Sequence, residues 1–212
     1  MNILYEDEYI VAAVKPSGVL SQSGEGANMI DLLSQGRGDI FPVHRLDKNV
    51  GGTMVFAKTK SASAAMSSMI QNNEIQKEYL AVVCGEPHEK NGVFEDLLFK
   101  DSSKNKSFVV KRMRKGVKKA VLEYETLQTV NNGEQILSLV KVKLHTGRTH
   151  QIRVQFSSRK MPLLGDGRYG GKCGKCDIAL WSERLLFNHP VTGQTICLES
   201  EPPAQYPWKL FG

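Results

Sequence analysis

The sequence lacks any long apolar run. Although 41% of its residues are hydrophobic, no stretch approaches the ~20 consecutive apolar residues that a membrane-spanning helix needs. Its first residues include Glu6, Asp7 and Glu8, where a secretory signal would be basic and then apolar. The two absences predict a cytoplasmic protein that does not associate with a membrane.

Cysteine is scarce, with four residues in 212. Cys173 and Cys176 form one Cys-x-x-Cys pair, but Cys84 and Cys197 supply no second pair at zinc-like spacing. His189 is the one candidate for a third ligand. There is also no His-x-Glu motif and no carboxylate cluster, which disfavours a metal-dependent deaminase or nuclease. We therefore expect reduced thiols in a Gly-rich loop and no metal.

Acidic residues are almost absent between residues 100 and 119. This stretch holds nine basic residues and one acid, so its net charge is +8, whereas the rest of the +6 chain is slightly acidic. Such localised charge predicts salt-dependent binding of a polyanion through counterion release, and a solvated hairpin is the alternative. The residues expected to contact the polyanion are Lys111, Arg112, Arg114 and Lys115.

Strand patterns dominate the chain, and no internal repeat, low-complexity tract or linker interrupts them. Alternating or β-rich runs predict strands at residues 3–5, 9–14, 53–57, 79–84, 93–99, 107–110, 120–130, 135–144, 178–187 and 195–198. We predict one α+β domain over residues 1–212, built on a bent, mostly antiparallel mixed sheet with flanking helices and loops.

Three helices are expected beside these strands. Asn28 caps the first, which runs through Leu33. The second covers residues 61–73 and is predicted to turn Ala65, Met69 and Ile70 inward. The third covers residues 149–156, with Thr149 as its cap and Ile152 and Phe156 inward.

Two segments crowd charged and imidazole side chains against glycines. One is His44-Arg45-Leu46-Asp47 followed by Gly51-Gly52, and the other runs from Leu144 to Arg153. A carboxylate beside arginines stays ionised, as a nucleophile or base requires, and glycines let a flat ligand approach closely. An isolated Asp47 would more often be a turn or cap residue, but the neighbouring segments favour a functional site.

These segments resemble the signature motifs of RluA-type pseudouridine synthases. The resemblance includes His44–Asp47 ahead of Gly52, the Lys77-x-Tyr79 strand ending at Gly85, and Thr146–Arg153 continuing through Pro162, Gly165-Asp166 and Tyr169. Lys15-Pro16-Ser17-Gly18 and Asn188–Gly193 match as well. The five blocks follow the family order over nearly the whole chain, so we expect no S4-like domain of the kind that some relatives carry.

The resemblance implies isomerisation of uridine in ribosomal or transfer RNA to pseudouridine, by a cofactor-free and monomeric enzyme of the pseudouridine synthase fold. Asp47 matches the catalytic aspartate of the family. It either attacks the ribose C1′ as a nucleophile or removes the 2′-proton to give a glycal-type intermediate; both routes stay open. The target base must leave its stack, because stacking hides the atoms that react.

The other site residues follow from the same motifs. Arg153 matches the basic partner of the aspartate, with Arg148 as its rival, and Tyr79 matches the active-site tyrosine that stacks on the freed uracil. Arg45 matches the arginine that fills the gap left by the flipped uridine. The candidate substrate-binding residues are His44, Arg45, Arg148, His150 and Gln151. Among these, the two histidines are expected to bind loop backbone rather than to transfer protons.

One segment departs from the family pattern. Val50-Gly51-Gly52 stands where most relatives have Thr-Ser-Gly, so hydroxyls are lost and Gly51 is expected to add flexibility to the aspartate loop. This departure motivates the alternative of a non-catalytic RNA-binding or ribosome-assembly protein on the same scaffold. The joint presence of Asp47, Tyr79 and Arg153 favours the enzyme.

Overall fold

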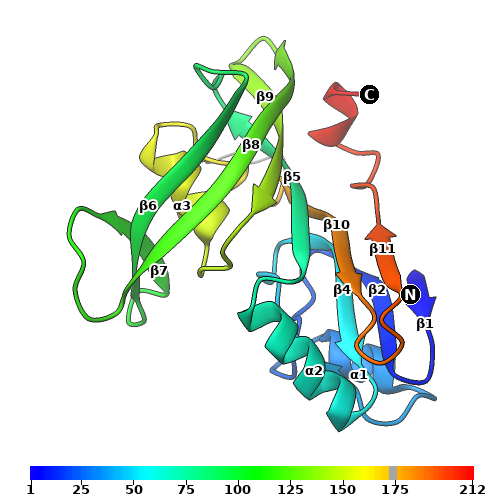
Figure 1. Cartoon of the computed structure of the whole chain (residues 1–212). Helices are drawn as coiled ribbons and strands as arrows, with labels where there is room; N and C mark the ends of the chain where they lie inside the picture. Colours follow the sequence, from blue (N-terminus) through cyan, green and yellow to red (C-terminus); the bar gives the residue numbers. More distant parts are fainter. Residues whose placement is uncertain (172–175) are drawn as a thin grey trace. The chain divides into compact units, whose positions relative to one another are not determined.

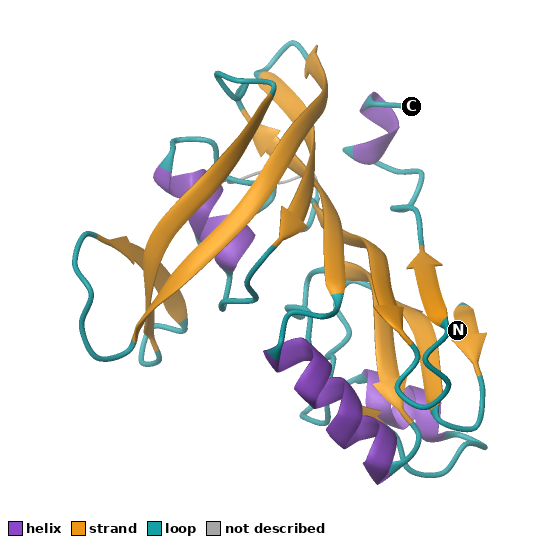
Figure 2. Ribbon diagram, in the orientation of Figure 1, coloured by secondary structure: helices purple, strands orange, loops and turns teal. Residues whose placement is uncertain are grey.

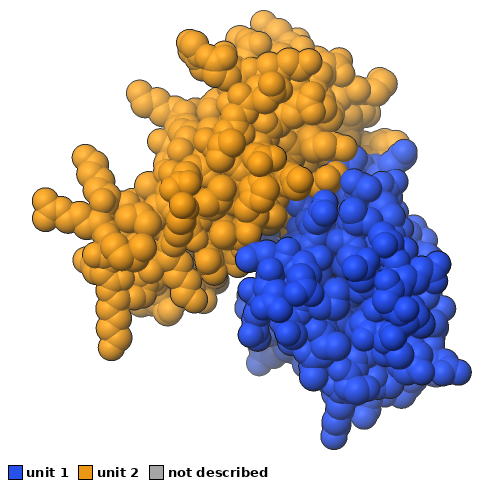
Figure 3. Space-filling model, in the orientation of Figure 1, with its two compact units in different colours: residues 1–77, 181–202 blue, residues 78–180, 203–212 orange. Residues whose placement is uncertain are grey.

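The structure is a computed structural model that describes residues 1–171 and 176–212 (Figure 1). Cys173, with the centre of its Gly-rich loop, lies outside the described residues. The chain forms two units, shown in separate colours in Figure 3. Unit 1 consists of residues 1–77 and 181–202, and unit 2 consists of residues 78–180 and 203–212.

The sheet of unit 1 is mixed. Its strands are ordered β1 (Ile3–Glu6), β2 (Ile10–Lys15), β4 (Gly51–Ala57) and β10 (Leu180–Asn188), with β3 (Phe41–Pro42) beside β4 and β11 (Thr195–Glu199) beside β10. β10 runs parallel to β4, whereas β1/β2, β2/β4, β3/β4 and β10/β11 are antiparallel. All residues of β4 are buried, which confirms the predicted buried strand at 53–57 and extends it to both glycines.

Two helices accompany this sheet. α1 (Met29–Ser34) begins as predicted, because the Asn28 side chain accepts the Asp31 N–H at 3.0 Å. α2 (Lys60–Gln71) buries Ala62 and Met66 in a cluster with apolar residues of β2, β4, β10 and β11. Met69 and Ile70 pack against this cluster as predicted, whereas Ala65 is not part of it.

The sheet of unit 2 has the order β5 (Gln76–Cys84), β9 (Ile136–Leu144), β8 (Val117–Asn131), β6 (Asn91–Asp101) and β7 (Lys106–Val110). The β6/β7, β6/β8 and β8/β9 pairs are antiparallel. The long strands in Figure 2 correspond to β6, β8 and β9. A short 3₁₀ turn, Trp208–Leu210, closes the C-terminal segment. The α+β class with a mostly antiparallel mixed sheet is thus confirmed.

α3 (Gln151–Ser158) packs against the sheet of unit 2. Its Phe156 ring lies 5.0 Å from the ring of Phe94 on β6, and both Ile152 and Phe156 are buried as predicted. The predicted cap was wrong. The N-cap is His150, in the left-handed conformation with φ of 54°, while the Thr149 carbonyl accepts the hydroxyl of Ser107. No helix among the described residues is long and apolar enough to cross a membrane.

Candidate active site

Asp47 opens a tight turn in unit 1. The Val50 N–H donates to the Asp47 carbonyl at 3.0 Å. The preceding residue is anchored twice by Ser21, whose Oγ accepts the Leu46 N–H at 2.9 Å and donates to the Leu46 carbonyl at 2.7 Å. Leu46 is buried, whereas Asp47 is partly exposed. The chain thus presents the carboxylate from a fixed backbone position.

Lys15 fastens this turn from the interior of unit 1. It is fully buried, and its Nζ donates to the carbonyls of Pro16 (2.9 Å), Val19 (2.6 Å) and Lys48 (2.9 Å). Burial lowers the pKa of the Lys15 ammonium to about 8, although the nearby Asp47 carboxylate favours the charged form. The sequence motif Lys15-Pro16-Ser17-Gly18 includes this lysine but predicts no role for it; the local signal was a lysine ending an otherwise apolar strand.

The rest of the Lys15–Gly18 motif makes further bonds to the same turn. The Gly18 N–H donates to the Lys48 carbonyl at 2.9 Å, and the Ser17 hydroxyl donates to the Asn49 carbonyl at 3.0 Å. Two motifs that are 30 residues apart in the sequence therefore form one hydrogen-bonded assembly around the candidate aspartate.

His44 has a structural role here. Its Nε2 accepts the Val55 N–H at 3.1 Å, which requires that this nitrogen carry no proton. Burial and the charge of Lys77 lower the pKa of His44 to about 3, so the ring stays neutral at physiological pH. His44 thus binds backbone as expected, although this backbone belongs to strand β4 rather than to a loop. Arg45 is exposed, and its contact with substrate stays a prediction.

The two glycines after the turn are packed rather than flexible. Gly51 pairs with Trp181 across β4 and β10, and a Cβ on Gly51 would lie 2.3 Å from Trp181 Cζ3. Gly52 has φ of 119°, and a Cβ there would lie 2.3 Å from the Ser182 carbonyl oxygen. The expectation that Gly51 loosens the aspartate loop was wrong, because the indole occupies the space that a side chain would need.

Arg153 is held by a buried carboxylate in unit 2. Its Nε and Nη2 donate to Asp166 Oδ2 and Oδ1 at 2.7 and 2.9 Å, and the two side chains are 6% and 0% exposed. The guanidinium carbon also lies 5.2 Å from the centre of the Tyr169 ring. This bidentate grip orients the guanidinium. Sequence reasoning noted Asp166 in a motif but assigned it no role, since its partner is 13 residues away.

Gln151 organises the loop before α3. Its Oε1 accepts the Thr146 hydroxyl at 2.8 Å and the Arg148 N–H at 3.0 Å, while its Nε2 donates to the Val121 carbonyl at 3.1 Å. The Arg148 Nε donates to the Lys119 carbonyl at 2.9 Å. These bonds give Gln151 a positioning role. Substrate binding by Gln151 and Arg148 stays a prediction.

His150 takes part in a second buried network. Its Nδ1 lies 3.1 Å from the Tyr169 hydroxyl, which also accepts the Ser107 N–H at 2.8 Å. Burial raises the pKa of Tyr169, so the phenol stays protonated. His150 thus joins α3 to β7, and its contact with substrate stays a prediction, as does that of Tyr79, which is buried in β5.

The basic stretch spans the end of β6, all of β7, a loop and the start of β8. The residues predicted to contact a polyanion, Lys111, Arg112, Arg114 and Lys115, are exposed in the loop. The Arg114 guanidinium lies 5.0 Å from the Phe99 ring centre. Within residues 1–171 and 176–212, no three His, Cys, Asp or Glu side chains gather as metal ligands would.

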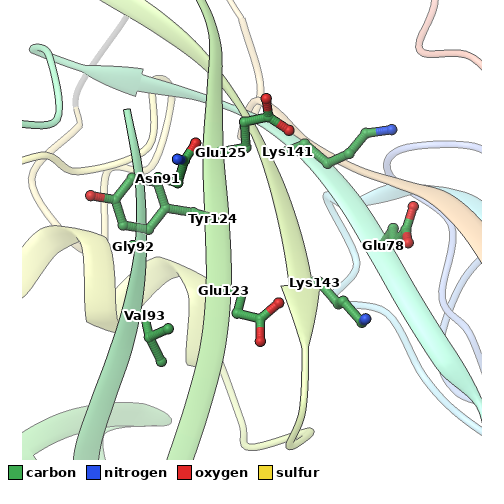
Figure 4. A pocket seen from close by; sticks show the side chains of 9 residues that line it. All are labelled: Glu78, Asn91, Gly92, Val93, Glu123, Tyr124, Glu125, Lys141 and Lys143. Atoms are coloured by element: carbon green, nitrogen blue, oxygen red, sulfur yellow. The ribbon is translucent and has the colours of Figure 1, made fainter. Parts of the chain in front are cut away.

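A groove of about 490 Å³ lies on unit 2 over β6, β8 and β9 (Figure 4). Its charged lining residues are Glu78, Glu123, Glu125, Lys141 and Lys143. Register places Glu123 opposite Lys143 and Glu125 opposite Lys141. Because acids and lysines alternate here, the groove does not present the uniform positive charge that a polyanion selects.

Comparison with known proteins finds relatives along nearly the whole chain. Residues 9–158 match the family described as RNA pseudouridylate synthase. The "Uncharacterized RNA pseudouridine synthase YhcT" of Bacillus subtilis (strain 168) is 32% identical, over 96% of this chain and 69% of the relative. The tRNA pseudouridine synthase C of Pasteurella multocida (strain Pm70) is 30% identical, over 93% and 90%. Ribosomal large subunit pseudouridine synthase D of Zymomonas mobilis (strain ATCC 31821 / ZM4 / CP4) is 30% identical, over 96% and 69%.

Solved structures share the fold. Human RNA Pseudouridylate Synthase Domain Containing 1 has a TM-score of 0.80 at 22% identity, covering 96% of this chain and 84% of its own. Human RNA Pseudouridylate Synthase Domain Containing 4 has a TM-score of 0.77 at 22% identity, covering 95% and 88%. At this level of identity the likeness concerns architecture.

Proposed function

The chain belongs to the RNA pseudouridine synthase family, of the RluA type, and from this premise we propose that it isomerises uridine in ribosomal or transfer RNA with Asp47 as its catalytic carboxylate. In this reaction the N1–C1′ glycosidic bond breaks, the uracil turns, and C5 bonds to C1′. The C5 proton leaves to solvent and N1 takes up a proton, so the product is an isomer of the substrate. The bond changes occur within one nucleotide and consume no co-reactant.

The observation that carries the proposal is the construction of the Asp47 turn. Ser21 anchors the residue before it, and Lys15 and the Gly18 N–H both hold the carbonyl of Lys48. A partly exposed carboxylate on such a fixed backbone meets two requirements of a nucleophile or base, which are access to substrate and a defined position. The buried Lys15 ammonium supplies part of that fixed position.

Arg153 and Tyr79 complete the proposed catalytic set. Asp166 orients the Arg153 guanidinium before substrate arrives, and a preorganised cation favours the ionised form of a carboxylate. Tyr79 supplies an aromatic face for the uracil and a hydroxyl for proton transfer. The exposed Arg45 fills the space that the flipped uridine leaves in the RNA.

We also propose that both units belong to one catalytic domain of residues 1–212. The family match over residues 9–158 begins in unit 1 and continues into unit 2. Relatives named as ribosomal and as transfer RNA enzymes both align over most of this chain, so both RNA classes are candidate substrates in the cytoplasm. Lys111, Arg112, Arg114 and Lys115 extend the RNA path in this proposal.

Tritium release from RNA labelled at uridine C5 tests the catalytic role. We expect Asp47→Ala and Asp47→Asn to release no tritium above background while they bind RNA as the wild type does. Asp39→Asn is the matched control, because Asp39 is an exposed carboxylate in the same unit, and it should keep full activity. Undiminished release by the Asp47 variants would refute the proposal. Wild-type RNA binding without any release would favour the non-catalytic alternative.

A further inference from the structure

A second hollow on unit 2 differs from the groove of Figure 4 in its charge. It has a volume of about 170 Å³ and lies where β6, β7 and β8 meet the loop before α3. Its lining includes Lys100, Lys118 and Arg148 and no acidic residue. A single water needs only about 10–15 Å³ of such space, so the hollow admits a polyatomic group. We call it the basic pocket.

Strand register explains how two of these cations come together. Lys118 on β8 pairs with Leu98 on β6, and Lys100 is two residues beyond Leu98, so alternation puts both lysines on the same face. Diagonal neighbours of this kind have Cα atoms about 7–8 Å apart. Both ammonium groups can therefore reach the same space, and an anion bound there would reduce the repulsion between them.

These cations are not neutralised by carboxylates within residues 1–171 and 176–212. Lys119, the neighbour of Lys118, pairs with Glu95 at 2.7 Å, but neither Lys100 nor Lys118 has an ion pair there. Arg148 has no carboxylate partner in those residues either, and its Nε is bound to the Lys119 carbonyl. The pocket therefore holds three uncompensated positive charges.

The pocket is also preformed on its Arg148 side. The Arg148 Nε donates to the Lys119 carbonyl, and the Arg148 backbone N–H donates to Gln151 Oε1. Because the side chain is already held, little conformational entropy is lost when its remaining guanidinium nitrogens bind a ligand. Gly147 leaves the entrance open, because a Cβ there would have no atom within 4 Å. Leu98, buried at 3% exposure, forms an apolar wall that strengthens charge interactions beside it.

We propose that the basic pocket binds one backbone phosphate of the substrate RNA and so fixes the register of the strand on unit 2. This inference rests on the proposed function for the identity of the polyanion, and it assigns Lys100 and Lys118 a role distinct from that of the exposed loop at residues 111–115. The pocket has room for a phosphate, and arginine and lysine side chains are the usual donors to a phosphate in proteins. Bound there, it contributes affinity and position but no sequence preference.

The main experiment measures RNA affinity as a function of salt concentration for Lys100→Gln with Lys118→Gln. We expect the slope of log K against log salt to fall by about 1 and KM to rise about tenfold, with kcat at saturating RNA unchanged. Both lysines are exposed, so the double variant should fold, and Lys→Arg at the same positions should restore the slope.

The matched control is Lys141→Gln with Lys143→Gln, which removes the same charge from the same unit. Lys143 pairs with Glu123, and Glu123 follows Leu122. Leu122 pairs with Phe94, whose ring contacts Phe156 of α3, so Lys143 lies on the opposite face of the sheet. Its salt slope should equal that of the wild type. Equal slopes for the pocket and control variants would overturn the proposal.

A second pair of variants tests charge without removing a lysine. Gly147→Asp adds a carboxylate at the open entrance, and Gly147→Asn adds a group of the same size without charge. We expect the Asp variant to bind RNA at least about tenfold more weakly than the Asn variant at low salt, with the difference vanishing at high salt. Equal affinities of the two variants would contradict a phosphate at this place.

Two further measurements distinguish an RNA phosphate from free phosphate in the basic pocket, and the pocket from the proposed function. Titration with inorganic phosphate distinguishes the source of the anion: phosphate binding that the pocket variants lose, with RNA slopes unchanged, would show a free-phosphate site and overturn the RNA assignment. Tritium release by the wild type tests the proposed function independently. If release is absent while the slopes still differ between pocket and control variants, the proposed function fails and the pocket assignment stands.

Discussion

The contact between Arg153 and Asp166 yields the sharpest prediction. In Asp166→Asn, one carboxylate oxygen becomes an amide NH₂ that faces a guanidinium N–H at the present distance of 2.7 or 2.9 Å. A hydrogen bond is replaced by a donor–donor contact, and Arg153 loses its countercharge within unit 2. Since the two side chains are 6% and 0% exposed, water cannot compensate.

The magnitude follows from this burial. Removing one partner of a buried ion pair costs about 3–5 kcal/mol, and we expect a loss near 3 kcal/mol because Asn keeps the size and one acceptor of Asp166. Activity should fall as well, by about a hundredfold in kcat, since a displacement of about 1 Å in a catalytic group has that effect. KM should change less, because RNA contacts elsewhere are intact.

Urea unfolding and tritium release measure the two effects on the same variant. Asp96→Asn is the matched control: Asp96 binds Arg159 at the other end of α3 at 2.8 Å, with side chains 12% and 30% exposed. We expect that control to lose about 1 kcal/mol and to keep kcat. An Asp166→Asn protein as stable as the wild type, or as active as the control, would refute the reasoning.

Three other predictions concern unit 1. Gly51→Ser should destabilise the protein by about 1–3 kcal/mol through overpacking against Trp181, and Trp181→Leu in the same chain should recover part of that loss; additive losses in urea unfolding would contradict the contact. His44 has a pKa lowered from 6.5 to about 3, so the unfolded chain binds a proton first as the pH falls. The free energy of unfolding should therefore decrease from about pH 6.5 toward pH 3, by about 3 kcal/mol at pH 4. If the free energy of unfolding of His44→Gln fell as steeply as that of the wild type over this pH range, this prediction would be wrong. Lys15→Met leaves three carbonyls without their donor and should cost at least about 3 kcal/mol while lowering kcat; a stable, fully active variant would exclude the fastening role.

Strands and helices were predictable where the local sequence carried a clear signal. The β-rich run of β2, the partial alternation in β8 and the Asn28 cap are local signals, and the structure has a strand or a helix start at each. The predictions were wrong where tertiary packing determines the structure. Packing against the sheet of unit 1 determines which residues of α2 are buried, and β3, with two residues, is too short to show a periodic pattern.

The sequence motifs pointed to the candidate site residues, but not to the residues that contact them and hold them in place. The motifs around Asp47 and Arg153 stood out because charge and glycine coincide there. Their partners did not stand out, because proximity across the chain leaves no local pattern. Lys15 reaches the Asp47 turn from 33 residues away in the bond to Lys48, and Trp181 fills the space above Gly51 from a different part of the chain.

Lys15 and Asp166 differ from the residues proposed to react in that both are charged side chains with no exposure to solvent. Each is a fully buried charge, and burying a charge is costly unless its bonds are all satisfied. Lys15 satisfies three backbone carbonyls and Asp166 holds the Arg153 guanidinium, so each charge fixes the geometry of the groups around it. It follows that substitutions at Lys15 and Asp166 should lower stability and kcat together, whereas substitution of the partly exposed Asp47 should lower kcat alone. If Asp47→Asn proved as destabilising as Asp166→Asn, Asp47 would have to be regarded as part of the scaffold.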